Sequence, residues 1–383
     1  MGFAEFLGNQ GTVERLRESV LHQRIPQAII LAGPRGAGKY TLALMYARLI
    51  NCLNPVVSKL EPGVPNDRSS SLGWSDGLPD YCGACHNCER IGEAADLEAR
   101  ITEALSARDD LRETDKRETR ILIQPHPDVL IIPPDPPQNL IKIGQVRQVI
   151  HNAYYRPPVE SKRSIFLFTS SAFMKEAANS LLKVLEEPPP NCTLILLSEN
   201  PAEMLPTIRS RAMLHRLGAI PVETLEQLLA TRRPDLKGPR RALVARMSHG
   251  AVGRALSFDA ETYLASRTDA LIILRSALRD PDFSTLFRAT DTYRGGADGQ
   301  EKTLNLLRAT NSLIEDMLLL IAGTPQLVRN QDIAAELSQL ATGIGIDWID
   351  HAANALADVE KGMRRNLLRS LSLDAMALAL DRA

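Results

Sequence analysis

The sequence lacks the features that would place a protein in a membrane or direct it through one. Its longest purely apolar runs, such as Met317 to Ala322, are far shorter than the roughly 20 apolar residues of a membrane-spanning helix. The first residues carry neither the basic start nor the apolar stretch of a secretory signal peptide. We therefore expect a cytoplasmic protein without a membrane partner, in a compartment where disulfides are rare.

The chain also lacks an excess of charge of either sign. Its 45 Lys and Arg residues are balanced by 46 Asp and Glu residues, which gives a formal net charge of −1. No overall field would draw the isolated chain to nucleic acid or to an anionic surface. Any contact with DNA has to come from a local patch or from an assembly with other chains.

Short apolar runs alternate with helical patterns in the first part of the chain. The runs are typical of buried parallel strands and lie at 28–32, 129–132, 164–168 and 193–197. Helical segments such as 143–153 and 175–187 lie between them, and this alternation predicts an α/β fold with a mostly parallel sheet. After about Leu217 only helical patterns remain. We predict an α/β domain, a small helical domain and a larger helical domain, over residues 1–217, 218–259 and 260–383.

Two segments interrupt the α/β pattern. Residues 54–80 are rich in Pro, Gly, Ser and Asp and have no hydrophobic period, which predicts a surface loop. Residues 93–120 are about half charged, with three apolar residues at helical spacing. The second segment is predicted to form an exposed helical excursion.

A glycine-rich turn follows the first apolar run. The string from Gly33 to Lys39 fits the phosphate-binding loop, in which glycines turn backbone N–H groups toward phosphate and a lysine reaches the terminal phosphates. We predict that Gly33, Gly36, Gly38 and Lys39 bind phosphate. The plainer interpretation is a turn that only connects a strand to a helix.

Two elements that a P-loop ATPase needs are missing. The residue after the lysine should be Ser or Thr, whose hydroxyl binds Mg²⁺, but it is Tyr40. Thr41 comes one residue late and would point about 100° away on a helix. The strand at 164–168 should end at a carboxylate but is followed by Thr169 and Ser170. We predict at most weak binding of ATP or ADP, no Mg²⁺ and no ATP hydrolysis by this chain.

Four of the five cysteines suggest a metal site. Cys82, Cys85 and Cys88 follow one another at two intervening residues, and Cys52 lies 30 positions upstream. Four thiolates suit tetrahedral Zn²⁺ and leave no open position for a substrate water, so the predicted site is structural.

Other interpretations of the cysteines stay open. His86 could replace Cys52 as the fourth ligand, and three closely spaced cysteines also suit an iron–sulfur cluster. Ordinary core cysteines are a third interpretation, although a compact triple in a turn is not core patterning. Cys192 stands alone beside an apolar strand and is predicted to be buried and inert.

Further strings complete a resemblance. Besides the phosphate loop and the cysteines, they are Phe6-Leu7-Gly8-Asn9-Gln10, His126-Pro127-Asp128, Asn179 to Pro189, and Ile208-Arg209-Ser210-Arg211. With these strings the chain resembles the clamp-loader AAA+ family over most of its first 260 residues. The run that ends in Glu186-Glu187-Pro188-Pro189 is the most specific of them.

The resemblance implies a fold and a set of partners. It implies an AAA+ P-loop domain over 1–217, a helical lid domain over 218–259 and an all-α collar domain over 260–383. It also implies a zinc module at about 50–92, before the charged insertion at about 93–120. The implied partners are the gamma/tau ATPase subunits and the delta subunit of a hetero-pentamer. Through that complex they include the sliding clamp and the primed DNA of DNA polymerase III.

The departures from the family pattern separate two kinds of subunit. An ATPase subunit should have Asp-Glu at Phe168 and Thr169, and an arginine that reaches the γ-phosphate at Gly253. Arg254 is adjacent, but on a helix it would face elsewhere. Together with Tyr40, these losses are typical of the non-catalytic delta-prime subunit.

Arg211 is the residue to which the resemblance gives a catalytic role. The family places this arginine at a subunit interface, as an arginine finger on ATP bound by a neighbour, where a guanidinium stabilises charge on the γ-phosphate. The usual Ser-Arg-Cys string reads Ser210-Arg211-Ala212 here. The plainer interpretation is an exposed or ion-paired arginine at a helix end, and Arg209 is the nearby competitor for the role.

Three functions follow from these patterns. The first is a non-catalytic stator subunit of a clamp loader, and the second is an active gamma/tau-type ATPase. The third is a zinc-dependent DNA-binding module, which is disfavoured because the residues around the cysteines are mainly acidic. ATP turnover by the purified chain separates the first two.

Overall fold

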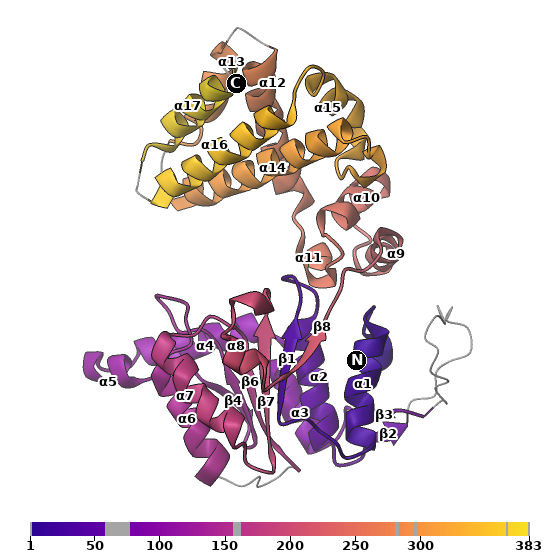
Figure 1. Ribbon diagram of the computed structural model, residues 1–383, viewed down its shortest axis with the longest axis vertical. Coiled ribbons are helices and arrows are strands. Elements are labelled where there is room, and N and C mark those ends of the chain that lie inside the picture. Colours follow the sequence, from indigo (N-terminus) through magenta and orange to yellow (C-terminus); the bar gives the residue numbers. More distant parts are fainter. Residues whose placement is uncertain are drawn as a thin grey trace. The chain divides into compact units, whose positions relative to one another are not determined.

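The computed structural model describes residues 2–57, 77–155, 162–279, 283–294, 297–364 and 367–381. The chain forms two compact units (Figure 1). The first unit comprises Met1–Pro221 together with Gly250–Arg254, and the second comprises Val222–His249 together with Ala255–Ala383. The finer division into a lid and a collar domain stays a prediction.

A six-stranded sheet forms the centre of the first unit, in the order β4-β5-β6-β7-β1-β8. All neighbouring strands are parallel except β4 and β5, so the predicted α/β class with a mostly parallel sheet is confirmed. The strands are β1 (Ala28–Ala32), β4 (Ile123–His126), β5 (Val129–Ile132), β6 (Ser164–Phe168), β7 (Cys192–Ser198) and β8 (Met213–Arg216). The four inner strands are the four predicted apolar runs, and they are buried along their whole length.

Helices cover both faces of this sheet. Ile29 and Leu31 of β1 belong to one apolar core, whereas Ala28, Ile30 and Ala32 belong to another, because successive side chains of a strand point to opposite faces. The two faces are covered by different helices, as Figure 1 shows. One face carries α1 (Gln10–Leu21), α2 (Lys39–Asn51) and α3 (His86–Gly92), and the other carries α6 (Ile143–Tyr155) and α7 (Lys175–Glu186).

The two interrupting segments differ in what the structure describes. Most of the predicted loop over 54–80 lies outside the described residues, but its ends pair as β2 (Val56–Val57) and β3 (Pro79–Asp80). The charged segment forms α4 (Leu97–Asp109), which has no fully buried residue, and α5 (Glu113–Glu118). The Arg108 guanidinium attaches α4 to the sheet through an ion pair of 2.7 Å with the buried Asp135 carboxylate.

The described part of the second unit contains only helices. They are α9 (Val222–Arg232), α10 (Gly238–Met247), α12 (Ala260–Leu278), α13 (Ser284–Asp291), α14 (Ala297–Ile321), α15 (Ala334–Leu340), α16 (Ile346–Arg364) and α17 (Arg369–Asp381). The apolar faces of all of these helices except α9 form one core, as their leucine-rich stripes predict. None of the helices in the described part of the chain is long and apolar enough to cross a membrane.

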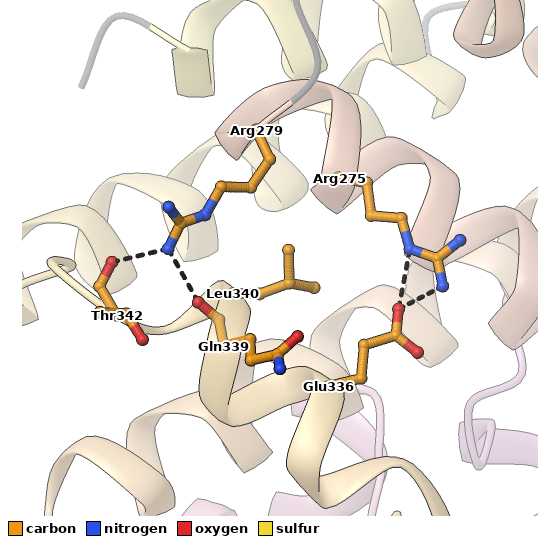
Figure 2. A pocket seen from close by; sticks show the side chains of 6 residues that line it. All are labelled: Arg275, Arg279, Glu336, Gln339, Leu340 and Thr342. Atoms are coloured by element: carbon orange, nitrogen blue, oxygen red, sulfur yellow. Dashed lines mark hydrogen bonds and ion pairs between the residues drawn. The ribbon is translucent and has the colours of Figure 1, made fainter.

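Two arginines attach α15 to α12. The Arg275 guanidinium pairs with the Glu336 carboxylate, and Arg279 Nη2 donates to the carbonyl oxygens of Gln339 and Thr342, at 2.8 and 3.1 Å (Figure 2). They flank a cavity of about 460 Å³, to whose wall Leu340 contributes. Both guanidiniums already have partners in the protein.

Candidate functional site

The phosphate loop lies between β1 and α2 and depends on glycine. Gly36 and Gly38 have φ of +81° and +85°, in the left-handed region that favours residues without a Cβ. A Cβ at Gly36 would lie 2.7 Å from the backbone nitrogen of Arg254, and one at Gly38 would lie 3.0 Å from the Phe6 ring. The loop is therefore closely surrounded by other parts of the first unit.

Lys39 is bound by the loop itself. Its Nζ donates to the carbonyl oxygens of Gly33 and Pro34, at 2.6 and 2.8 Å. Burial lowers the pKa of Lys39, and the carboxylate of Glu199, just after β7, opposes that shift. To bind Lys39, a phosphate group would have to replace these two carbonyl oxygens as the hydrogen-bond partner of the ammonium group.

A helix end also contacts the loop. The backbone N–H of Gly253, in α11 (Val252–Ser257), donates to the carbonyl oxygen of Gly36 at 2.8 Å. A Cβ at Gly253 would lie 3.1 Å from that oxygen and 3.2 Å from Gly36 Cα. A side chain at position 253 would therefore press on the loop, which would have to give by a few tenths of an ångström to admit an arginine.

Tyr40 makes a structural contact where an ATPase has a magnesium ligand. Its hydroxyl donates to the carbonyl oxygen of Ala94 at 2.5 Å, and burial raises the pKa of Tyr40. Ala94 lies just beyond α3, the helix that contains Cys88 and follows directly after Cys85. The phenol therefore connects the start of α2 to the cysteine-containing segment.

Replacing Tyr40 by Phe is expected to destabilise the first unit by about 0.5–1.5 kcal/mol, because one hydrogen bond is lost and the Ala94 carbonyl is left without it. Urea denaturation measures the effect. Tyr154→Phe is the matched control, since the Tyr154 hydroxyl also donates to a carbonyl, that of Glu187, but from an exposed side chain. Equal destabilisation by the two changes would contradict this role of Tyr40.

No carboxylate follows β6, where an ATPase would need one. The backbone N–H of Thr169 donates to the carbonyl oxygen of Ile132, and the Ser170 hydroxyl oxygen accepts from the backbone N–H of Ala172. Glu199, after β7, is the acidic residue whose charge acts on Lys39. The sequence analysis missed Glu199, although its place directly after a buried parallel strand is a signal for the carboxyl edge of the sheet.

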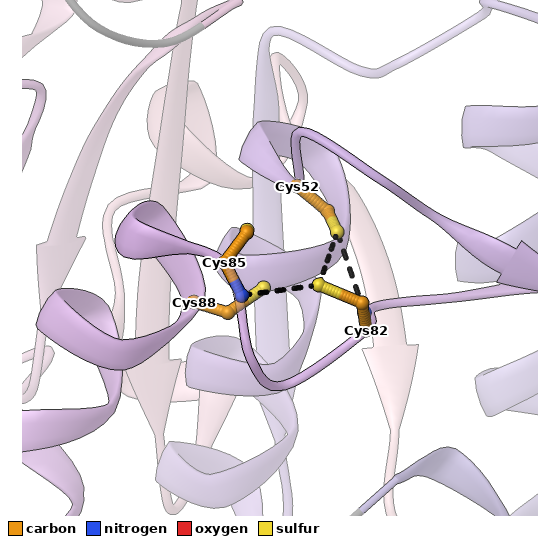
Figure 3. A group of neighbouring side chains, drawn as sticks. All are labelled: Cys52, Cys82, Cys85 and Cys88. Atoms are coloured by element: carbon orange, nitrogen blue, oxygen red, sulfur yellow. Dashed lines mark hydrogen bonds between the residues drawn. The ribbon is translucent and has the colours of Figure 1, made fainter.

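The structure brings all four predicted cysteines together. The sulfur atoms of Cys52, Cys82, Cys85 and Cys88 lie within 4.8 Å of one another (Figure 3). Backbone N–H groups point at two of them, from Cys82 to Cys52 Sγ and from Cys85 to Cys82 Sγ, at 3.3 Å each. The four thiols are a possible metal site, and their number and spacing suit a structural zinc ion.

The position of Cys52 has a local cause. Cys52 follows α2 and Cys82 follows β3, and the antiparallel pairing of Val56 with Asp80 brings these two segments together. His86 is exposed and its Nε2 faces Arg90, so it is not part of the cluster. Cys192 is buried in β7, and burial raises its pKa to about 12.

Arg211 lies two residues beyond α8 (Pro206–Arg209) and is exposed. Its Nη1 donates to the carbonyl oxygen of Thr207 at 3.1 Å, and its Nη2 lies 3.1 Å from the Glu186 carboxylate at the end of α7. Arg209 is also exposed, and its side chain has no hydrogen bond or ion pair with another described residue, although its backbone N–H donates to the Leu205 carbonyl oxygen. Both arginines are accessible to a partner protein, but only Arg211 is held in place.

The chain matches the protein family described as DNA polymerase III, delta subunit, over residues 8–221, which is more than half of its length. The chain belongs to this family. The resemblance found in the sequence is thereby confirmed at the level of the family. The matched segment contains the phosphate loop, the four cysteines and Arg211.

Individual relatives of this DNA polymerase III subunit carry two different names. The delta' subunit of Bacillus subtilis is 22% identical over 92% of this chain and 90% of its own length. The delta' subunit of Pseudomonas aeruginosa is 25% identical over 53% of this chain and 51% of its own. The tau/gamma subunit of Haemophilus influenzae is 22% identical over 67% of this chain but 30% of its own. The chain thus matches only a third to a half of the last two relatives.

Proposed function

We propose that the chain is the non-catalytic, delta-prime type of subunit of a replicative clamp loader. Its partners would be gamma/tau ATPase subunits and a delta subunit in a hetero-pentamer that loads a sliding clamp onto primed DNA. In this proposal the first unit is an AAA+ P-loop domain, and residues 218–259 and 260–383 are its lid and collar. Membership of the DNA polymerase III delta subunit family supports this context.

The contact between Gly253 and the phosphate loop is the observation that carries the non-catalytic role. An ATPase of this kind needs an arginine side chain near the γ-phosphate, whereas position 253 holds a glycine that packs closely on Gly36, so that a Cβ there would lie 3.1 Å from the Gly36 carbonyl oxygen. With Tyr40 after the loop lysine, the chain lacks the hydroxyl that would bind Mg²⁺. With Thr169 after β6, it lacks the carboxylate that an ATPase needs there. Weak binding of ATP or ADP through Gly33, Gly36, Gly38 and Lys39 remains compatible with the loop.

The cysteine cluster is proposed to hold one structural Zn²⁺. Four thiolates complete the coordination shell of zinc, so the ion would have no position for a reacting water. Its contribution would be to hold the end of α2, the paired strands β2 and β3, and α3 together.

Arg211 is proposed to act as an arginine finger on ATP bound by the neighbouring ATPase subunit. Its exposure and its hold on Thr207 and Glu186 support this role, because a guanidinium that is already oriented loses less freedom when it binds phosphate. Large apolar side chains are exposed on the same stretch of chain, at Leu205, Met213 and Leu214, which favours a protein-facing surface.

The purified chain is expected to show no ATP hydrolysis above background. A turnover assay with Mg²⁺ and ATP tests this, with Lys39→Ala as the loop variant. Lys175→Ala is the matched control, because Lys175 is an exposed lysine at the first position of another helix of the same unit. Turnover that Lys39→Ala abolishes and Lys175→Ala preserves would overturn the non-catalytic role.

That outcome would favour the second candidate function, an active gamma/tau-type ATPase. The match to the tau/gamma subunit over 67% of this chain is the observation in its favour. In that case α11 would have to leave the loop when nucleotide binds.

A further inference from the structure

A buried asparagine lies between two of the clustered cysteines. Asn87, in α3 between Cys85 and Cys88, is only 1% exposed. Its Nδ2 donates to the carbonyl oxygen of Asn51 at 3.0 Å, and its Oδ1 lies 3.1 Å from Nε2 of His126. One side chain therefore contacts both the segment before Cys52 and the end of β4.

The histidine of the His126-Pro127-Asp128 string is fixed by its own turn. His126 is fully buried, and its Nδ1 accepts a hydrogen bond from the backbone N–H of Asp128 at 3.1 Å. Nε2 is therefore the protonated ring nitrogen and donates to Asn87 Oδ1. The donor and the acceptor are therefore assigned for each hydrogen bond that links Asp128, His126, Asn87 and Asn51.

Asn51 continues the link toward the sheet. It is fully buried directly before Cys52, and its side-chain amide makes two bonds to the backbone of Arg163, Nδ2 to the oxygen at 3.0 Å and Oδ1 from the nitrogen at 3.1 Å. The residue before Cys52 is thus tied to the start of β6, and the residue between Cys85 and Cys88 is tied to β4.

We propose that Asn87 and His126 are positioning residues of the metal centre. They would set the distance between Cys52, which follows α2, and Cys85 and Cys88, at the start of α3. These cysteines lie on segments that share no helix or strand. The inference rests on the proposed metal centre. Outer groups that orient metal ligands typically contribute about 10–100-fold to metal affinity. A leucine at position 87 would keep the volume but leave the His126 N–H and the Asn51 carbonyl without this partner.

The test uses the full chain loaded with Co²⁺, whose tetrahedral complexes with thiolates give a visible d–d absorption band. The measured quantities are the position of that band and the rate at which EDTA removes the ion. Asn87→Leu and His126→Leu are each expected to shift the band and to speed release about 10–100-fold. The double variant should add little to either, because both changes break the same link. His126→Gln keeps an N–H donor, so it should release the ion as slowly as the wild-type chain does. This variant also tests the proposal if His126→Leu does not fold.

Two controls separate positioning from a general loss of stability. His86→Ala changes an exposed residue of the same helix outside the link, and Tyr154→Phe removes a bond between α6 and the residue after α7. Both should keep the wild-type band and release rate. Wild-type behaviour of Asn87→Leu and His126→Leu would overturn this inference alone. A wild-type chain that takes up neither Co²⁺ nor Zn²⁺ would overturn the metal centre, and this inference with it.

Discussion

Replacing Arg211 by alanine is expected to slow ATP hydrolysis at the neighbouring subunit of an assembled loader, while this chain stays folded and assembles. The side chain is exposed, and its partners are the exposed Glu186 carboxylate, the Thr207 carbonyl and the Ser210 hydroxyl, so little stability depends on it. At the site that it completes, loss of an arginine finger costs up to about 10³–10⁵ in phosphoryl transfer. The other sites of the ring keep their own groups, so total turnover would fall by roughly the share of one site.

A reconstituted loader with clamp and primed DNA provides the measurement. Clamp loading should suffer more than assembly, because the guanidinium is needed only when a γ-phosphate is present. Arg209→Ala is the matched control, two positions away, exposed and outside the Glu186 pair. If Arg209→Ala slows ATP hydrolysis and Arg211→Ala does not, Arg209 is the arginine finger. If neither substitution changes ATP hydrolysis or clamp loading, this chain has only a scaffold role.

Removing the metal is expected to unfold the cysteine-containing segment. The purified chain should hold about one Zn²⁺, as four thiolates would bind. Structural zinc contributes about 10–16 kcal/mol to folded zinc-finger peptides, an upper guide here because α2 and α3 also pack on the sheet. Cys85→Ser or a strong chelator should therefore lower the melting temperature markedly, which circular dichroism measures.

Cys192→Ser is the control for metal content. Cys192 is buried in β7, outside the cluster, so its replacement should leave the zinc stoichiometry unchanged. Iron in the purified protein, or no metal under reducing conditions, would contradict the zinc assignment. A strong loss of ATP hydrolysis by a Cys85→Ser loader that is otherwise intact would point to a different role for the cluster.

The sheet could be predicted from the sequence wherever a strand is buried on both faces. Residues 28–32 and 164–168 are continuous apolar runs because neighbouring strands and helices enclose them. β4 and β8 were missed, since they are edge strands with mixed composition: β4 contains a proline, and three of the four residues of β8 are exposed. Edge strands have no such apolar signature.

The candidate site was predictable where its residues are neighbours in the sequence. The glycines around Lys39 and the cysteine triple have spacings that their chemistry imposes. The contact of Gly253 with Gly36 and the link from Asn87 to His126 were not predictable, because each joins segments that are distant along the chain. Tyr40 shows the limit: the sequence indicated that it cannot bind Mg²⁺, but not that its hydroxyl bonds to Ala94.

The packing of α11 on the phosphate loop has an evolutionary consequence. A Cβ at position 253 would lie 3.1 Å from the Gly36 carbonyl oxygen, so an arginine restored there alone would press on the loop. A threonine restored at position 40 alone would lose the bond to Ala94. Each single reversion lowers stability before any activity can return, since the others are still missing. For the proposed non-catalytic subunit, the loss of ATPase activity would then work as a ratchet: reversion would need several simultaneous substitutions, whereas further drift needs one.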